Sequence, residues 1–330
     1  MKDDFLHGGA LDRMQIAYPN APAPWVDLST GINPWPYPVG DIPASSWQHL
    51  PTEAALQTCR AAMARAIGAP EASLLLAPGS ELLIRLLPTV IAPRSVALLS
   101  PTYGDHARAW RASGAEVIET ADPLALAGHV DALVLCNPNN PTGMVLERSH
   151  LGQALARQAA RNGWLIVDEA YADLVPALSL APMAGAGNLI ILRSFGKFYG
   201  LAGLRLGALL GPPALLEAMS QRLGVWPVSG PALAIGAQAY ADGLWQAETR
   251  DHLAAARRRL DKILLDSGLW IVGGTDLFRL VKTEKAPQLW HRLAEAGLYV
   301  RRFDYAPDLL RIGLPANAEA EHRLAAALSP

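Results

Sequence analysis

Short apolar runs alternate with helix-prone stretches through the middle of the chain. Each run has five or six residues and is bounded by glycine, proline or polar residues, a pattern typical of buried strands. Strands separated by helices predict an α/β protein with a mostly parallel sheet covered on both faces. The predicted strands are 73–77, 95–99, 115–119, 131–136, 164–168, 188–193 and 206–211, and the predicted helices are 52–67, 81–91, 105–112 and 147–162.

The two ends of the chain have a different pattern. The first 43 residues are rich in Gly, Pro and Asn with little periodicity, which indicates an extended arm rather than a packed element. Towards the C-terminus, a long helix-prone stretch (231–267) precedes short apolar runs at 270–272, 276–281, 298–300 and 309–314, typical of a smaller α+β domain. We therefore expect an arm (1–43), a large domain (44–220) and a small domain (221–330).

Composition narrows the class of protein. The chain has 330 residues, 51% apolar and 18% charged, enough for two domains with one sizeable core. A net charge of −2 gives no electrostatic reason to expect nucleic acid or an anionic membrane as a partner. The polar N-terminus and the interrupted apolar runs predict neither a signal peptide nor a membrane span. Two cysteines, Cys59 and Cys136, have no metal-ligand spacing, so we expect a cytoplasmic protein without a metal.

Lys197 lies in a glycine-rich segment (194–207, SFGKFYGLAGLRLG) between two predicted buried strands. Burial lowers the pKa of a lysine, and such a lysine is a good nucleophile that forms Schiff bases with aldehydes. Ser194 and Arg205 flank it and could share a phosphate. A surface lysine in a glycine-rich loop is the plainer interpretation, but serine, lysine and arginine at this spacing favour the chemical one.

This segment resembles the lysine segment of fold-type I pyridoxal-phosphate (PLP) enzymes, the aspartate aminotransferase superfamily. It is most similar to the branch of the histidinol-phosphate aminotransferases and threonine-phosphate decarboxylases. The resemblance continues in N-P-N-N-P-T-G at 137–143 and D-E-A-Y at 168–171, and it covers nearly the whole chain. It implies the fold of PLP-dependent transferases, with a mostly parallel seven-stranded sheet in the large domain, and PLP as the cofactor.

The resemblance also implies how the cofactor is held. Lys197 would carry PLP, and Lys197, Asp168 and Tyr171 would act in catalysis. The remaining cofactor contacts would be made to the phosphate by Gly79, Ser80, Glu81, Ser194 and Arg205, to the ring face by Tyr103, to the ring oxygen by Asn140 and Tyr171, and to the ring nitrogen by Asp168. Helix capping is the plainer interpretation for Ser80 and Asp168, and ordinary packing for Tyr103. Because a carboxylate repels phosphate, we expect Glu81 to turn its backbone to the site.

For the substrate, the resemblance points to the arm and to two arginines. A His-Gly-Gly at 7–9 and D-L-S-T-G-I-N-P at 27–34 resemble the start of threonine-phosphate decarboxylases, whereas histidinol-phosphate aminotransferases usually lack the His-Gly-Gly. Arginines in apolar runs are rarely unpaired. The implied substrate contacts are His7, Gly31, Asn33, Asn140, Arg301 and Arg311. For Arg301 a solvated face is the alternative, because Arg302 adjoins it.

The resemblance also implies a homodimer, and an arm without its own core is expected to pack on a partner.

The sequence departs from the family pattern near the first predicted helix. Relatives commonly carry a Tyr-Pro whose tyrosine touches the cofactor phosphate of the partner subunit, and the corresponding stretch here is His49-Leu50-Pro51. If this alignment holds, the contact is missing and the phosphate is held otherwise.

Three functions stay open at this point. The His-Gly-Gly arm favours PLP-dependent decarboxylation of L-threonine O-3-phosphate to (R)-1-amino-2-propanol phosphate for cobalamin biosynthesis. A histidinol-phosphate-type aminotransferase would use the same lysine, aspartate and arginines. A catalytically inactive PLP-fold binding protein is the third alternative, and the retention of Lys197, Asp168 and Arg205 together argues against it.

Overall fold

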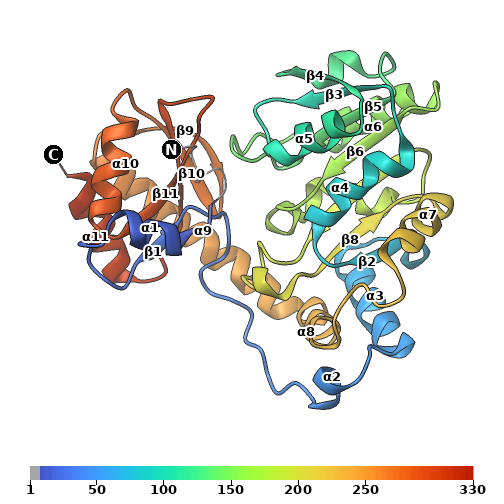
Figure 1. Cartoon of the computed structure of the whole chain (residues 1–330), viewed down its shortest axis with the longest axis horizontal. Helices are drawn as coiled ribbons and strands as arrows, with labels where there is room; N and C mark the ends of the chain where they lie inside the picture. The colour runs from blue at the N-terminus through green and yellow to red at the C-terminus, as the bar shows by residue number, and fades with distance from the viewer. Residues whose placement is uncertain (1–7, 330) are drawn as a thin grey trace. The chain divides into compact units, whose positions relative to one another are not determined.

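Seven strands form the larger of two sheets in this computed structural model, which describes residues 8–329 (Figure 1). β8 runs antiparallel to both of its neighbours, and the other neighbouring pairs are parallel. The mostly parallel sheet predicted from the alternation of apolar runs and helices is therefore confirmed. In sheet order, the strands are β2 (Leu74–Ala77), β8 (Gly207–Leu210), β7 (Leu189–Ser194), β6 (Trp164–Asp168), β5 (Ala132–Cys136), β3 (Ser95–Leu99) and β4 (Glu116–Thr120).

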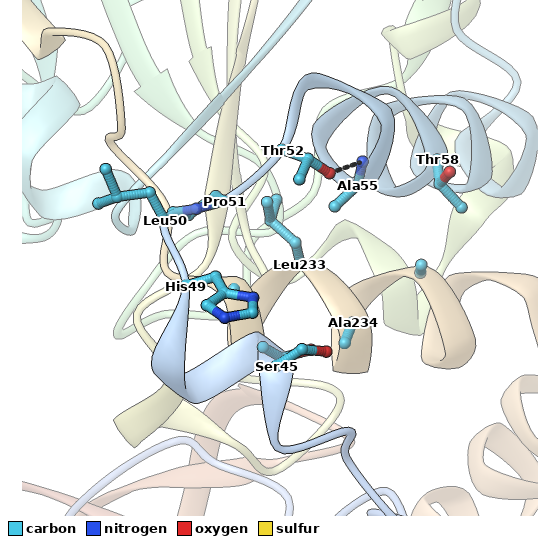
Figure 2. A pocket seen from close by; sticks show the side chains of 12 residues that line it. Ser45, His49, Leu50, Pro51, Thr52, Ala55, Thr58, Leu233 and Ala234 are labelled. Carbon is cyan, nitrogen blue, oxygen red and sulfur yellow. Dashed lines mark hydrogen bonds between the residues drawn. The ribbon is translucent and has the colours of Figure 1, made fainter.

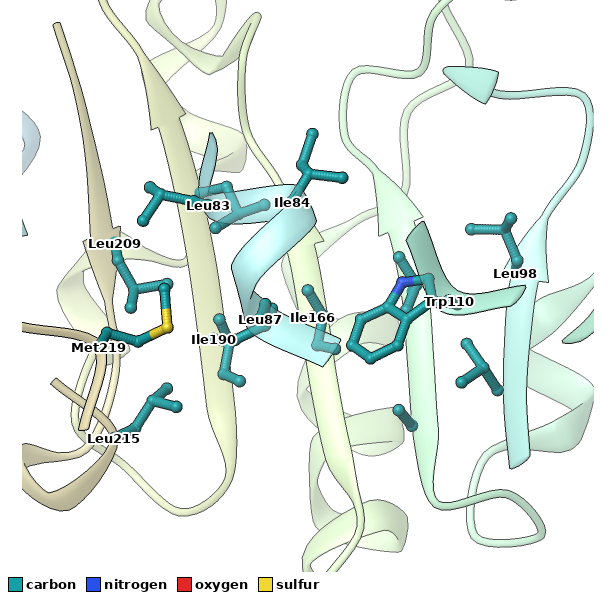
Figure 3. Close-up of a cluster of buried hydrophobic side chains, with 14 of the residues drawn as sticks. Leu83, Ile84, Leu87, Leu98, Trp110, Ile166, Ile190, Leu209, Leu215 and Met219 are labelled. Carbon is teal, nitrogen blue, oxygen red and sulfur yellow. The ribbon is translucent and has the colours of Figure 1, made fainter. Parts of the chain in front are cut away.

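A hydrophobic core lies between one face of this sheet and three helices, α4 (Ser80–Ile91), α5 (Gly104–Ala112) and α7 (Pro213–Leu223). Leu87 of α4 and Trp110 of α5 belong to one buried cluster with Ile166 and Ile190 of the central strands (Figure 3). Side chains alternate along a strand, so the polar residues that end β6 and β7 two or four positions beyond these isoleucines lie on the same helix-covered face. The other helices of this part are α2 (Ser45–Gln48), α3 (Glu53–Ile67), α6 (Arg148–Ala159) and α8 (Gly230–Ala241).

The smaller sheet has the order β1-β11-β12-β10-β9 and is mixed. β1 and β11 are parallel, and the remaining neighbours are antiparallel. Its strands are β1 (Val26–Leu28), β9 (Trp270–Thr275), β10 (Phe278–Lys282), β11 (Leu298–Arg302) and β12 (Leu309–Gly313), and its helices are α1 (Leu11–Ala17), α9 (Gly243–Asp266), α10 (Ala286–Glu295) and α11 (Ala318–Leu328). The predicted small α+β domain thus contains the strands expected from its apolar runs.

The prediction of an extended, unpacked arm is wrong for the described part of residues 1–43. This part contains α1, whose Met14 is fully buried, and β1, which pairs with β11 at Val26↔Leu298. A three-residue strand is too short to show periodicity, and its partner lies far away in the sequence. No local pattern could therefore have revealed either contact.

The long helix-prone stretch 231–267 is also not one helix. It is interrupted at Asp242, which ends α8 and whose carboxylate accepts a hydrogen bond from the backbone N–H of Trp245 (3.0 Å) in the first turn of α9. An aspartate before a helix satisfies N–H groups that have no partner within the helix. The composition of the stretch, rich in Ala, Leu and Arg, masks this single break.

The chain separates into two compact units. The large unit comprises Pro36–Asn140 and Met144–Gln246 and contains the seven-stranded sheet; the small unit comprises the chain up to Trp35, Pro141–Gly143 and the chain from Ala247 onward. The three-part division of the sequence at residues 43 and 220 stays a prediction. Every helix among the described residues is too short or too polar to cross a membrane.

Candidate active site

A cavity of about 230 Å³ lies in the large unit and collects the predicted cofactor residues from separate segments. The carboxyl ends of β2, β3, β5, β6 and β7 meet at one edge of the sheet, and ligands of open α/β sheets bind outside such an edge. The predicted residues that line the cavity are Ser80, Glu81, Tyr103, Asn140, Asp168, Tyr171, Ser194, Lys197 and Arg205. Ile84, Cys136, Pro138 and Ala170 complete its lining and were not predicted.

One end of the cavity is built for an anion. α4 begins at Ser80 without a side-chain cap, so its first N–H groups and its dipole face outward. Gly79 precedes it with φ +84°, and a Cβ at Gly79 would lie 2.8 Å from Nη2 of Arg205. The guanidinium therefore stands beside the helix N-terminus, where a glycine lets it approach. Backbone N–H groups, a guanidinium and the hydroxyl of Ser194 form a set of donors that suits a phosphate.

The carboxylate of Glu81 is engaged with two neighbours. Tyr103 donates its hydroxyl to Oε2 (2.9 Å), and Arg85 donates Nε to Oε1 (2.8 Å). Burial, together with the charge of Glu81, raises the pKa of Tyr103, which keeps its hydroxyl protonated as the donor. Glu81 thus fixes the ring of Tyr103 at the cavity wall, a role that the sequence did not suggest.

Asp168 is buried at the end of β6 and accepts two hydrogen bonds. Oδ1 accepts from the backbone N–H of Ala170 (3.0 Å), and Oδ2 lies 3.0 Å from Nε2 of His106 on α5. Burial lowers the pKa of His106, but its hydrogen bonds to Asp168 and Cys136 outweigh this and raise the pKa to about 10. The contact with Asp168 therefore favours the protonated imidazole of His106 and orients the carboxylate.

His106 is not among the site residues predicted from the sequence. A signal was present, because His106 lies in the first turn of a predicted helix that begins just after Tyr103. His106, Cys136 and Asp168 offer ligand atoms within 4.8 Å of one another, a set that could hold a metal ion. The hydrogen bond between the imidazole and the carboxylate already uses two of these groups.

These residues fit PLP. The donors around Gly79 match its phosphate, and the carboxylate of Asp168 matches a protonated ring nitrogen. Lys197 lies on the connection between β7 and β8 and lines the same cavity, where its amine can meet an aldehyde. Gly79 gives the fit a structural basis, because its φ of +84° is a conformation that other residues rarely adopt, and it leads the chain into the first N–H groups of α4.

The small unit holds Arg311 in a defined setting. This buried side chain donates Nη2 to the backbone oxygen of Ser29 (2.6 Å), and its guanidinium lies 5.0 Å from the ring centroid of Phe278. Ser29 is itself held by Asp27, which accepts from its backbone N–H (2.8 Å) and its hydroxyl (2.6 Å). The D-L-S-T-G-I-N-P segment therefore positions an arginine that the resemblance assigns to the substrate.

The other predicted substrate residues are placed as follows. Arg301 on β11 lies directly opposite Arg311 on β12. Burial lowers the pKa of Arg301, and the charge of Arg311 lowers it further. Asn33 is buried and accepts a hydrogen bond from the N–H of Trp35 (2.9 Å), and Gly31 is buried nearby in the chain. Asn140 lines the cavity of the large unit, and His7 lies outside the described residues.

Sequence comparison with known proteins covers the whole chain. The sequence profile of the family Aminotransferase class I and II matches residues 44–328. A threonine-phosphate decarboxylase from Sinorhizobium sp is 42% identical over 334 residues, which cover 100% of this chain and 99% of that protein. A threonine-phosphate decarboxylase from Pseudomonas aeruginosa is also 42% identical, over 98% of this chain and 96% of that protein. The resemblance inferred from the motifs is confirmed.

Comparison with solved structures agrees on the fold. The histidinol-phosphate aminotransferase from Sinorhizobium meliloti, solved in complex with pyridoxal-5'-phosphate, matches with a TM-score of 0.75 at 24% identity, over 86% of this chain and 83% of that one. At this identity the likeness shows the fold alone, and it is the predicted fold. The chain therefore belongs to the PLP-dependent aminotransferase class I and II family, as a homologue of the threonine-phosphate decarboxylases near the histidinol-phosphate aminotransferases.

Proposed function

We propose that this protein is a threonine-phosphate decarboxylase that uses PLP. The observation that carries the proposal is 42% identity over the full length to proteins of that name. A cavity whose donors suit PLP supports it. The product would be (R)-1-amino-2-propanol phosphate, for cobalamin biosynthesis.

The cavity residues have separable tasks in this proposal. PLP, when bound, supplies an electron sink for the bond that breaks at the substrate Cα. Asp168 would keep the ring nitrogen protonated, and His106 would hold the carboxylate of Asp168 in place. Lys197 would bind the cofactor and move a proton at Cα, while Tyr171 and Asn140 would contact the ring oxygen. Tyr103 would lie against the ring face and be held there by Glu81.

The phosphate of the substrate would be the handle that selects decarboxylation. Arg301 and Arg311 place two positive charges directly opposite each other on neighbouring strands, and these charges repel. A phosphate would relieve that repulsion, and guanidinium forks suit its geometry. Gripping the phosphate end leaves the carboxylate free to turn out of the ring plane. Binding energy from this remote group would thus orient the reacting bond.

Arg301→Ala tests this handle. We expect kcat for L-threonine phosphate to fall about tenfold or more and KM to rise, because orientation and binding are both lost. Arg302→Ala is the matched control, since its guanidinium lies 4.4 Å from the ring centroid of Trp290 and has no proposed role in the site. His7→Ala should resemble Arg301→Ala. Equal turnover of L-threonine and its phosphate, or an unchanged Arg301 variant, would contradict the phosphate handle.

The aminotransferase alternative rests on the same cavity. An aminotransferase would hold the substrate carboxylate so that the C–H bond is the one that breaks, with the same lysine, aspartate and arginines. The likeness to a histidinol-phosphate aminotransferase structure supports the shared fold but does not favour this reaction. The two reactions differ in their products, since only transamination needs a keto acid.

The protein would work as a homodimer, as the family resemblance implies. The helices α2 and α8 pack together, and exposed apolar side chains lie near them. Trp47 is in α2 and Leu50 follows it, while Val225 and Trp226 precede α8. A hollow of about 460 Å³ lies beside them, lined by Leu50, His49 and residues of α3 and α8 (Figure 2). Sedimentation of the holoenzyme tests this, and an active monomer would contradict it. The cytoplasmic location stays a prediction.

A further inference from the structure

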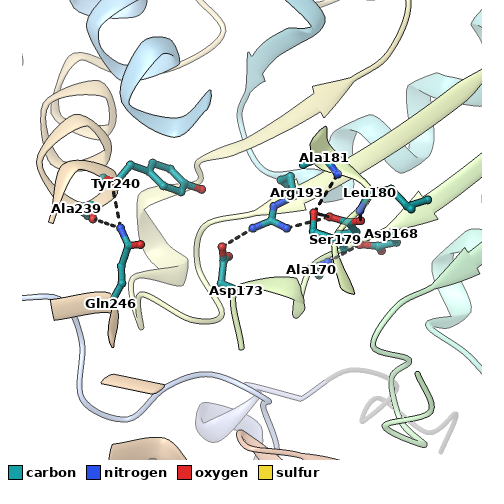
Figure 4. Close-up of polar contacts among 11 residues, drawn as sticks. Asp168, Ala170, Asp173, Ser179, Leu180, Ala181, Arg193, Ala239, Tyr240 and Gln246 are labelled. Atoms are coloured by element: carbon teal, nitrogen blue, oxygen red, sulfur yellow. Dashed lines mark hydrogen bonds and ion pairs between the residues drawn. The ribbon is translucent and has the colours of Figure 1, made fainter. Parts of the chain in front are cut away.

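Arg193, Glu169 and Asp173 form a buried ionic network that none of the proposed roles uses (Figure 4). Arg193 on β7 is only 2% exposed. It donates Nη1 to Oε2 of Glu169 (3.0 Å) and Nη2 to Asp173. Glu169 also accepts from the hydroxyl of Ser179 (2.6 Å) and from the N–H of Leu180 (2.6 Å). The three charged side chains therefore tie β7 to the segment that follows β6.

Each member of the network lies within two residues of a cavity residue in the sequence. Glu169 follows Asp168, Arg193 precedes Ser194, and Asp173 comes two residues after Tyr171. Neighbours on a strand point to opposite faces, so Arg193 lies on the face of the sheet opposite Ser194. A backbone hydrogen bond joins the same two segments, since the N–H of Glu169 donates to the oxygen of Leu192 (2.9 Å). The network thus fixes the backbone that carries the cavity residues, from the opposite face of the sheet.

Stability alone is a weak reason for such a network. Removing charges from water is costly, and well-packed apolar residues often stabilise a core as well as a buried ion pair does. Burial raises the pKa of Glu169, which shows how unfavourable its charge is in this place. The hydrogen bonds between a guanidinium and two carboxylates have a fixed geometry, which apolar contacts lack. It fixes the angle and separation of the strand ends that it joins.

We propose that Arg193, Glu169 and Asp173 are positioning residues that set the geometry of the cofactor site. Together they hold Asp168, Tyr171 and Ser194 at fixed relative positions. The inference rests on the proposed PLP site, but it does not depend on which substrate the enzyme decarboxylates. Its test is therefore cofactor binding, which can fail or succeed independently of the reaction.

The test removes the charges while keeping the size of the side chains. We would prepare Arg193→Met together with Glu169→Gln and Asp173→Asn, check folding of the apoprotein by near-ultraviolet circular dichroism, and titrate it with PLP through the visible band of the bound cofactor. We expect a folded protein whose Kd for PLP is about tenfold or more above the wild-type value, because small misplacements at a site have large effects. The pH dependence of the visible band should shift as well.

Two further variants keep the inference testable if the triple variant does not fold. Glu169→Gln alone leaves the pair between Arg193 and Asp173 intact and should weaken PLP binding by a smaller factor that still exceeds about twofold. Arg257→Met is the matched control, since Arg257 pairs with Asp261 and Asp276 (2.8 Å) in the small unit. It should lower Tm without changing the Kd for PLP. A folded triple or Glu169→Gln variant that binds PLP within about twofold of wild type, with an unshifted band, would overturn the proposal.

Discussion

Asp168 is the residue on which the proposed chemistry depends most. His106 and the N–H of Ala170 hold its two oxygens, so the carboxylate is oriented before any ligand binds. Asp168→Asn should fold normally but lose about 100-fold in kcat, because removing one preorganised electrostatic partner costs about 3 kcal/mol of barrier. Steady-state kinetics of the variant measure the loss of kcat, and thermal unfolding measures whether it folds normally. Near-wild-type turnover would mean that Asp168 merely shapes the turn after β6.

His106 predicts a pH dependence of stability. Its pKa is raised in the folded protein from the usual 6.5 to about 10, so its stabilising contribution is fully present below about pH 6.5 and is lost as the pH rises through about 10. His106→Gln keeps a donor but does not titrate. The Tm of the wild-type apoprotein should therefore fall towards that of His106→Gln between these pH values. A Tm difference that stays constant with pH would contradict the assignment of charge to His106.

At the scale of residues, the sequence predicted those site residues that belong to one short motif. Ser194, Lys197 and Arg205 are close in the sequence, and all three line the cavity. His106 was missed because its role depends on how α5 covers the end of β6. Arg193 was missed for a related reason, since a charged residue inside an apolar strand shows its partners only after Glu169 and Asp173 fold against it.

At the scale of elements, the anion site is made by three segments packed without side chains between them. A Cβ at Gly207 on β8 would lie 2.9 Å from the N atom of Ser80 and 2.7 Å from the backbone oxygen of Arg193. Gly207→Ala should therefore push the start of α4 away from Arg205. We expect PLP to bind about tenfold more weakly, equivalent to about 1.4 kcal/mol.

The control for this change is Gly152→Ala on α6, where a Cβ would meet nothing within 4 Å. That variant should bind PLP as the wild type does, and alanine is favoured over glycine within a helix. Equilibrium titration of both apoproteins with PLP makes the comparison. If Gly207→Ala binds PLP as tightly as Gly152→Ala, close packing of β8 against the start of α4 does not shape the anion site.

Elements with strong periodicity were predicted well, and short ones were not. The strands of the large sheet appear within a residue or two of the predicted ranges, because all of them except the exposed edge strand β4 are apolar runs buried on both faces. β1 has three residues, and its pairing with β11 depends on contacts across nearly the whole sequence. For that reason the sequence predicts an unpacked arm. Because the described part of the arm packs within its own chain, packing alone is no argument that the arm needs a partner subunit.

At the scale of the whole molecule, the sequence predicted the class of fold, while the division into units needed the structure. The chain passes between the units at Trp35–Pro36 and Gln246–Ala247, and the segment Pro141–Gly143 belongs to the small unit although it follows Asn140 directly. The second of these passages lies inside the continuous helix α9. No change of composition marks a boundary within a helix, so sequence reasoning could not place it.

The central claim is that this enzyme decarboxylates L-threonine phosphate. The most direct measurement incubates the PLP-loaded protein with L-threonine phosphate labelled at the carboxylate and follows labelled CO₂ and the amine product. A parallel reaction supplies histidinol phosphate and 2-oxoglutarate and follows glutamate. We expect labelled CO₂ in amounts equal to the aminopropanol phosphate formed, without a keto acid and without glutamate in the parallel reaction. Glutamate formation from histidinol phosphate, with no CO₂ from L-threonine phosphate, would contradict it.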